Sequence, residues 1–193
     1  MNNSLWNLKV KFYRSIRNYF PLNQILNCEN QKLEFLLNSL ETKQKKVLDI
    51  GTGTGNVLQF FADADCLIGI DITLPMLKAA MQIHPGSKLI QADALNVPVK
   101  PDSVEFITAV GLSEYLKDID LFFKEAHRIL RNGGYFLLTF SPSGLWSGLR
   151  FLLGHRIYPR SLEEIVTFAS NKQFLLIKSI RSLMQVQVLF QKI

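Results

Sequence analysis

The sequence contains few of the residues that build metal sites and disulfide frameworks. Its 193 residues include 2 cysteines and 3 histidines, and no cluster of His, Cys, Asp or Glu has the spacing of metal ligands. Cys28 falls in a predicted linker and Cys66 in a predicted strand, so we expect no metal and no disulfide framework. The composition therefore argues against disulfide-stapled secreted domains and favours a cytoplasmic protein.

Long uninterrupted hydrophobic runs are also missing. The longest uncharged stretch, Gly133 to Leu149, contains Gly, Pro and Ser and is typical of a strand followed by a loop, so we expect no transmembrane helix. The first apolar residues alternate with Lys9, Lys11 and Arg14, a pattern that argues against a signal peptide. With 193 residues, 48% of them hydrophobic, the chain is long enough for one sizeable core. We expect a single domain.

Acidic residues are scarce in the N-terminal segment. Residues 1–46 hold 8 Lys and Arg against 3 Asp and Glu, a balance of +5 out of the net charge of +6. Large apolar residues fall on one side of a helical wheel over residues 5–20, with Lys11, Arg14 and Arg17 on the other side, and Pro21 ends the pattern. We expect residues 1–45 to form a helical extension that packs over the sheet or covers the substrate as a lid. A helix lying on a membrane surface is the alternative.

A strand, a tight turn and a helix are predicted over Lys46 to Phe61, whose sequence is KVLDIGTGTGNVLQFF. The aliphatic residues before the turn are typical of a buried parallel strand, and the apolar residues after it have helical spacing. Gly51, Gly53 and Gly55 remove side chains from the turn, so backbone amides can approach a ligand closely. An ordinary glycine-rich turn without a ligand is the alternative interpretation.

The glycine spacing discriminates between cofactors. The dinucleotide pattern G-x-G-x-x-G requires a glycine at position 56, where this chain has Asn56. Instead, Asp49 followed by the three glycines resembles the first motif of the class I S-adenosylmethionine-dependent methyltransferases, of the small-molecule type that includes methyltransferase type 11. The resemblance implies S-adenosylmethionine as the cofactor and S-adenosylhomocysteine as the product.

Two later strands end on acids where this family holds its cofactor. Asp71 follows a strand over residues 66–70 and resembles the carboxylate that receives the ribose diol. Asp93 follows a strand over residues 88–92 and resembles the acid that accepts from the adenine amino group. The resemblance assigns the cofactor to Asp49, Gly51, Gly53, Gly55, Asp71, Ile72, Met76, Asp93, Ala94 and Val110.

The order of the predicted strands indicates the fold class. Strands over residues 47–50, 66–70, 88–92, 104–110 and 135–140 are separated mostly by helical patterns, which is typical of a parallel sheet. The last two strands, Phe174 to Ile180 and Met184 to Phe190, are joined by about three residues, too few for a parallel crossover. We therefore expect an α/β protein with a seven-stranded, mostly parallel Rossmann-like sheet, an antiparallel last strand and helices on both faces, over residues 46–193.

Helices are expected between these strands. One covers Glu29 to Leu40, and another begins after Thr73 with Met76, Leu77, Ala80 and Met81 on its apolar face. A helix over Asp118 to Leu130 is expected to turn Leu121 inward and to end at the glycines 133–134. A capping box at Ser161 and Glu164 predicts the start of the last helix.

The acceptor is defined mainly by exclusion. The residues after the fourth strand, GLSE, lack the Asn or Asp, two prolines and aromatic of enzymes that methylate nucleic-acid amino groups, and no cysteine stands where cytosine C5 enzymes need one. The resemblance therefore implies a small-molecule or lipid-like acceptor. Candidates to contact it are Glu114, Tyr115, Trp146, Arg150, Arg156 and Tyr158, and no catalytic base is assigned.

Two other functional classes remain as alternatives. One is a methyltransferase-fold partner subunit without turnover. The other is a nicotinamide-type oxidoreductase, which Asn56 and the terminal hairpin disfavour. The sequence does not predict the oligomeric state.

Overall fold

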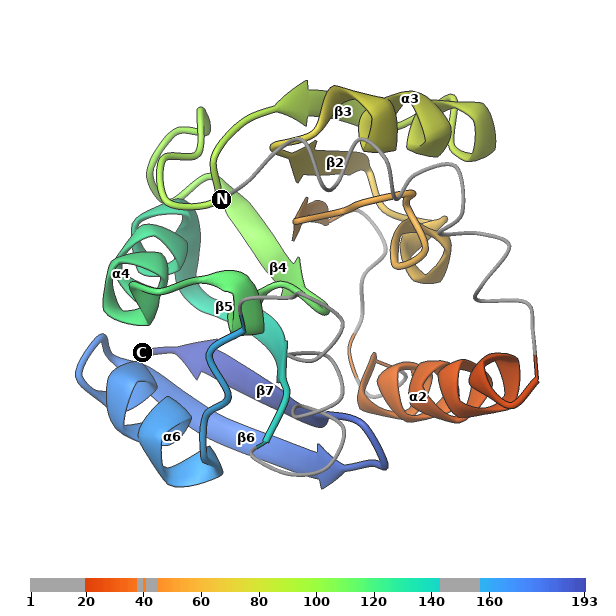
Figure 1. Ribbon diagram of the computed structural model, residues 1–193. Coiled ribbons are helices and arrows are strands. Elements are labelled where there is room, and N and C mark those ends of the chain that lie inside the picture. Colours follow the sequence, from red (N-terminus) through yellow and green to blue (C-terminus); the bar gives the residue numbers. More distant parts are fainter. Residues whose placement is uncertain (1–19, 38–39, 41–44, 143–156) are drawn as a thin grey trace.

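The computed structural model describes residues 20–37, 40, 45–142 and 157–193. Seven strands form one sheet in the order β3-β2-β1-β4-β5-β7-β6 (Figure 1). They are β1 (Lys46–Ile50), β2 (Cys66–Asp71), β3 (Lys88–Gln91), β4 (Val104–Ala109), β5 (Leu130–Phe140), β6 (Phe174–Arg181) and β7 (Val186–Lys192). The pairs β1–β2, β2–β3, β1–β4 and β4–β5 are parallel, and β7 is antiparallel to both β5 and β6. The predicted fold class and the terminal hairpin are confirmed.

Helices cover both faces of this sheet (Figure 1). The helices α4 (Ile119–Ile129) and α6 (Leu162–Ser170) pack on one face, where their apolar side chains join the larger hydrophobic cluster. The helix α2 (Leu22–Leu37) and the 3₁₀ helix η1 (Leu58–Phe61) pack on the other face around Val47, Phe106 and Leu137. The helix α3 (Leu74–Ile83) contacts β2 and β3. None of the described helices is long and apolar enough to cross a membrane.

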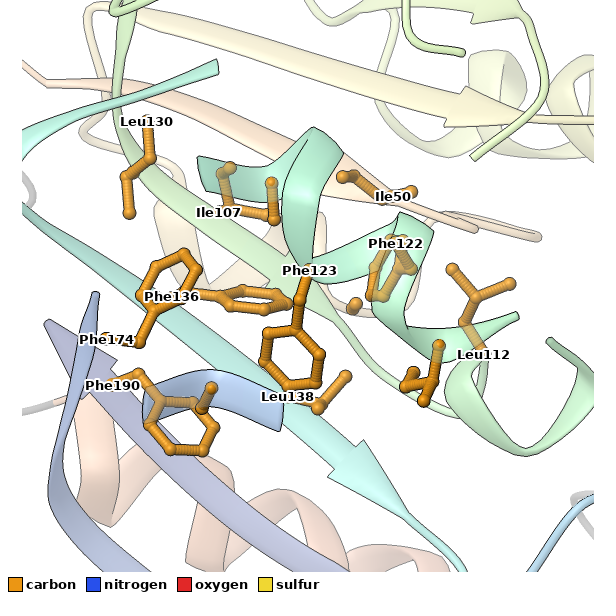
Figure 2. Close-up of a cluster of buried hydrophobic side chains, with 14 of the residues drawn as sticks. Ile50, Ile107, Leu112, Phe122, Phe123, Leu130, Phe136, Leu138, Phe174 and Phe190 are labelled. Carbon is orange, nitrogen blue, oxygen red and sulfur yellow. The ribbon is translucent and has the colours of Figure 1, made fainter. Parts of the chain in front are cut away.

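Phenylalanine rings fill the core between α4 and the C-terminal strands (Figure 2). Phe123 of α4 makes edge-to-face contacts with Phe136 of β5 and Phe190 of β7, at centroid distances of 5.8 and 6.0 Å. Such pairs add about 0.5–1.5 kcal/mol each beyond the burial of their area. Because β7 lies between β5 and β6, its aromatic residue joins helix, parallel sheet and hairpin into one core.

The helix expected after the glycine turn is instead the short 3₁₀ helix η1. Its hydrogen bonds join residues three apart, as in the bond from the Phe60 amide to the Val57 carbonyl, 3.1 Å. The connection between β1 and β2 covers only residues 51–65, and the glycine turn occupies its first part. Too little chain remains for an α-helix of ordinary length.

One other helix boundary, and the side chains predicted to point inward on two helices, differ from expectation. The second helix begins at Leu22, so Cys28 lies exposed in α2 and not in a linker. Leu121 and Met81 are 39% and 55% exposed, which makes their predicted inward facing wrong. In α4 the buried positions instead include Ile119, Phe122 and Phe123, with the i, i+3, i+4 spacing of one helix face.

The end of α4 is stabilised by a lysine and not by the predicted glycine. The helix ends at Ile129, and Leu130 already pairs with Val104 as the start of β5. The Lys192 ammonium, buried at this end, donates to the carbonyls of His127 and Leu130 at 2.9 and 2.7 Å. A donor from β7 therefore satisfies carbonyls that a glycine cap would otherwise serve.

The helix α2 is attached to the hairpin by one buried carboxylate. Glu29, 4% exposed, accepts from the Ser182 hydroxyl at 2.5 Å, the Met184 amide at 3.3 Å and the Gln187 amide nitrogen at 3.1 Å. The backbone carbonyl of Glu29 also accepts from Gln187 at 2.9 Å. We call this group of residues the Glu29 lock. The predicted amphipathic helix before α2, over residues 1–20, lies almost wholly outside the described residues.

The Glu29 lock predicts that two Glu→Ala substitutions in α2 differ in their effect on the free energy of unfolding, with the larger effect at Glu29. Glu29→Ala leaves buried donors of the hairpin unpaired, so we expect it to lower the free energy of unfolding by about 1–3 kcal/mol. Glu34→Ala, at an exposed position of α2, should change it by less than about 0.5 kcal/mol. Urea unfolding followed by circular dichroism measures both. Equal effects of the two substitutions would contradict the lock.

Candidate functional site

The candidate site lies at the carboxyl ends of β1 to β4, where parallel strands of an open α/β sheet place their ligands. Residues 51–55 turn there directly after β1, with φ angles of +74°, +54° and +83° at Gly51, Gly53 and Gly55. Two amides of the turn, from Gly51 and Thr52, donate to the Ile70 carbonyl at 2.8 and 2.9 Å. The turn is thus fixed to the end of β2.

The three glycines have different neighbours. A Cβ at Gly51 would meet Leu112 at 3.0 Å, and a Cβ at Gly55 would meet His84 and Ala80 at 2.9 and 3.3 Å. These two glycines are required by close packing within the protein. A Cβ at Gly53 would meet, among the described residues, only the Gly51 carbonyl oxygen at 4.0 Å. Gly53 therefore leaves open space beside a left-handed backbone, which is a suitable cradle for a ligand.

Asp71, at the end of β2, holds this cradle in place. Its Oδ2 accepts from the Gly53 amide at 3.0 Å, and its Oδ1 accepts from the amide of Thr73 at 2.8 Å and from the Thr73 hydroxyl. A carboxylate offers about four lone-pair sites, so the partly buried Asp71 retains acceptor capacity for a hydroxyl. The expected hydroxyl acceptor is thus also the residue that fixes the glycine turn.

Asp49 is buried one residue before the end of β1. Its side chain is 1% exposed, and its Oδ1 accepts from the Thr108 hydroxyl of β4 at 2.6 Å. Oδ2 makes no hydrogen bond of good geometry within the described chain, although the Thr52 hydroxyl lies beside the carboxylate. Burial raises the pKa of Asp49 from 3.8 to about 6, the hydroxyls of Thr108 and Thr52 oppose this shift, and the charge of Asp71 adds to it. A buried acceptor of this kind suits a cationic group of a ligand.

The other predicted cofactor residues lie near the same edge with different exposures. Asp93 is exposed, and its Oδ1 accepts from the Leu95 amide at 3.0 Å in the turn after β3. Ala94, Ile72 and Val110 are partly buried. Met76 is 2% exposed and packs into the core from α3. The direct roles of these residues toward a cofactor remain predictions.

A second buried cluster lies over the ends of β4 and β5. The 3₁₀ helix η2 (Ser113–Tyr115) follows β4 and carries Glu114, which is 3% exposed. The Glu114 carbonyl accepts from the Tyr158 amide at 2.7 Å, and its Oε1 accepts from the Ser141 hydroxyl at 3.4 Å. The structure therefore brings Glu114, Tyr115 and Tyr158 together, as candidates for one acceptor site. Trp146, Arg150 and Arg156 lie outside the described residues.

Arg160 is a structural residue of this cluster that the sequence analysis did not identify. It is 7% exposed and donates to the carbonyls of Ser113 and Leu116 at 2.8 and 2.5 Å. Burial lowers the pKa of Arg160, and the charges of Glu164 and Glu114 oppose this. The only signal in the sequence is its position directly before the capping box at Ser161, which does not reveal what it contacts.

The described part of the chain contains no group of three His, Cys, Asp or Glu residues able to hold an ion. His127, the histidine of α4, is in contact with the Phe174 ring at a centroid distance of 5.8 Å. Burial lowers its pKa. These surroundings are those of a residue that packs within the protein.

Residues 48–138 match the model of a family described as a methyltransferase domain. A demethylmenaquinone methyltransferase of Roseiflexus castenholzii is 36% identical over 95 residues, which cover 46% of this chain and 40% of that protein. A malonyl-[acyl-carrier protein] O-methyltransferase of Marinomonas sp. is 30% identical over 146 residues, 71% of this chain and 52% of that protein. The chain thus spans about half the length of the curated relatives it matches.

Solved structures agree in fold over nearly the whole chain. The magnesium protoporphyrin IX methyltransferase of Synechocystis PCC 6803, crystallised with bound SAH, superposes with a TM-score of 0.78 at 13% identity, covering 95% of this chain and 94% of that one. The PH0226 protein of Pyrococcus horikoshii gives a TM-score of 0.76 at 18% identity, covering 95% and 99%. At these identities the likeness establishes the fold alone.

The raised pKa of Asp49 predicts a pH-dependent contribution to stability. In the folded protein this carboxyl takes up a proton near pH 6, whereas in the unfolded chain it does so near its ordinary pKa of 3.8. Between these values the folded state binds more protons, so the contribution of Asp49 to the free energy of unfolding rises as pH falls from 7 to 4. We expect the difference in free energy of unfolding between wild type and Asp49→Asn to change by on the order of 3 kcal/mol across this range. Urea unfolding at several pH values measures it. Asp63→Asn, at an exposed position, is the control and should show no such change. If the difference between wild type and Asp49→Asn were also independent of pH, the raised pKa of Asp49 would be contradicted.

Proposed function

Because residues 48–138 match the model of a methyltransferase domain, we propose that this protein transfers a methyl group from S-adenosylmethionine to a small-molecule or lipid-like acceptor. The observation that carries the proposal is the cradle at Gly53, open on one side and held on the other by Asp71. The residues present fit such a cofactor in three places: the open backbone at Gly53, the remaining acceptor capacity of Asp71, and the buried Oδ2 of Asp49.

Each of these residues has its own task. Asp71 would accept from the ribose hydroxyls, as strand-end acids do in nucleotide-binding sheets. Gly53 would let the backbone approach the ligand without a side chain in between. The unpartnered Asp49 oxygen would receive the ammonium of the methionine end, directly or through a water, because a buried acceptor is stabilised by a cationic donor. This assignment requires an ionised Asp49, so affinity should fall as pH drops below about 6.

S-adenosylmethionine itself supplies a methyl group activated by the sulfonium, ready for in-line displacement. The protein then has to align the acceptor and exclude water. The cluster of Glu114, Tyr115 and Tyr158 is the best candidate for this task, since η2 follows β4 at the same edge of the sheet. Arg160 would act as a positioning residue that holds the backbone of η2. No residue is assigned as a catalytic base.

The nature of the acceptor is supported by the relatives. Their names give a demethylmenaquinone and a malonyl group on acyl-carrier protein as acceptors. Both are small or lipid-like groups, and neither is a nucleic acid. We extend only this chemical class to the present chain.

The decisive experiment is a mass-spectrometric screen of a cell extract for products methylated from isotope-labelled S-adenosylmethionine, with heat-inactivated protein as the blank. Cofactor binding without any labelled product would support the alternative of a partner subunit.

Removal of the Asp71 carboxylate tests the cofactor assignment. Asp71→Ala should weaken S-adenosylmethionine and S-adenosylhomocysteine alike, by about 1–3 kcal/mol, because ribose hydroxyls and the Gly53 amide lose their acceptor. Isothermal titration calorimetry measures both affinities, and Asp63→Ala is the exposed control. Unchanged binding by Asp71→Ala, or tighter binding of NAD than of either ligand by the wild type, would overturn the assignment.

A pair of glycine substitutions separates the ligand cradle from backbone strain. Gly53 and Gly133 both have positive φ angles, +54° and +75°, and open space around their Cβ positions among the described residues. Valine at either site should therefore cost similar strain, about 1–2 kcal/mol. Only Gly53→Val should abolish S-adenosylhomocysteine binding, since its side chain would fill the cradle. Calorimetry and thermal unfolding of both variants test this, and normal binding by Gly53→Val would reduce the turn to a structural role.

A further inference from the structure

Exposed apolar side chains gather on α2 and the β6–β7 hairpin. Four large residues there are strongly exposed: Phe35 at 57%, Leu175 at 51%, Ile177 at 45% and Leu183 at 62%. Single exposed apolar residues need no explanation, but several on neighbouring elements mark interaction sites. We call these four residues, with Lys32 and Lys178, the α2–β6 face.

Contacts and strand register place these residues side by side. The Lys178 ammonium lies 3.9 Å from the centroid of the Phe35 ring, and the Lys32 ammonium donates to the Arg181 carbonyl at 3.3 Å. Lys178 and Leu175 pair with Leu189 and Gln191, two residues apart in β7, so their side chains point to the same side of the sheet. That side is the one covered by α2, because Leu189 belongs to the α2 cluster.

The charges of the face have one sign. Its charged members are Lys32 and Lys178, and both are partly accessible. The two acids of α2 lie elsewhere: Glu29 is buried in the lock, and Glu34 falls on the opposite side of the helix from Lys32 at 100° per residue. Within α2 and β6, the face therefore combines exposed apolar side chains with positive charge and no accessible acid beside it.

The Glu29 lock makes the face a single unit. It ties α2 to the hairpin turn at residues 182–185, the turn that also carries Leu183. Because β7 runs antiparallel to β5, with Phe140 opposite Val186, this turn lies at the carboxyl edge of the sheet. The face thus reaches the same edge as the glycine turn and η2.

Strand pairing with a second copy does not suit this face. Although β6 is the edge strand of the sheet, Ile177 is skipped in the pairing between Leu176 and Lys178. An irregularity and a lysine on an edge strand are devices that prevent edge-to-edge association. A second copy related by a two-fold axis would also bring like charges together. The complementary partner is anionic and offers an apolar layer.

We propose that the α2–β6 face docks on the surface of an anionic lipid bilayer, with its apolar side chains in the headgroup boundary and its two lysines among the lipid phosphates. Basic residues near such a surface add attraction that falls as salt rises, and apolar side chains add burial. Docking in this way would hold the carboxyl edge of the sheet close to the membrane. The inference concerns a surface and does not depend on the methyl-transfer proposal.

Vesicle co-sedimentation of the full chain tests the proposal. Wild type should bind vesicles of phosphatidylcholine with phosphatidylserine, bind less at high salt, and bind little to phosphatidylcholine alone. The double variant Lys32→Glu/Lys178→Glu should weaken binding at least about tenfold. Leu175→Ser/Leu183→Ser should also weaken it, with the salt dependence retained. Thermal unfolding checks that both variants fold.

The helix α3 supplies a matched control. It exposes Leu74, Met81 and Ile83 at 46%, 55% and 46%, and Lys78 and Lys88 are exposed on α3 and β3. Lys78→Glu/Lys88→Glu makes the same change in net charge and should leave vesicle binding unchanged. Equal loss in this control would overturn the proposal, as would binding that survives both variants of the α2–β6 face. A dimer in sedimentation velocity that the α2–β6 substitutions dissociate would overturn it in favour of a second copy.

Discussion

The bond between the Gly53 amide and the Asp71 carboxylate is the contact on which the site depends. It joins the turn after β1 to the end of β2, and the Ile70 carbonyl reinforces the junction with two further amides. A turn with three positive φ angles has many alternatives in solution, since glycine restricts its own backbone little. The carboxylate selects one of them. The same side chain is thereby both part of the cradle and a candidate acceptor, so structure and binding are coupled at one residue.

Buried polar side chains fix the elements around this site in a similar way. Glu29 attaches α2 to the hairpin, Arg160, directly before the N-cap of α6, holds the backbone after η2, and Lys192 donates to carbonyls at the end of α4. Each interaction reaches from one segment of the chain to backbone groups or side chains of another. Hydrogen bonds to charged groups contribute about 1.5–3 kcal/mol when they are well formed, and leaving such a group unpaired costs more. These buried hydrogen bonds therefore specify one arrangement of helices and strands around the aromatic core. Hydrophobic packing alone is less directional and would fix this arrangement less strictly.

The sequence predicted the sheet and much of the candidate site because the signals are local. Glycines at positions 51, 53 and 55 followed by acids at strand ends lie within short stretches, and the hairpin follows from the short link between its strands. Arg160 and Glu29 were missed because their partners are distant: Arg160 bonds Leu116, 44 positions away, and Glu29 bonds Ser182, 153 positions away. The predicted helix boundaries were wrong where a contact from a distant part of the chain replaced a local one. At the end of α4, for example, the Lys192 ammonium binds the carbonyls that a glycine cap was expected to serve. Leu121 was misassigned because it lies about 200° around the helix from Ile119, outside the stripe of α4 that is buried.

The insertion of β7 between β5 and β6 has a consequence for the order in which the sheet assembles. When the chain emerges from the ribosome, β5 and β6 are both available before the strand that separates them. Until residues 186–192 follow, the outer side of β5 has no native partner, and Phe123 and Phe136 lack the ring of Phe190. A direct pairing of β6 with β5 would be a kinetic trap at this stage. The Ile177 irregularity and the cations of β6, placed on the edge strand, make such premature pairing less favourable.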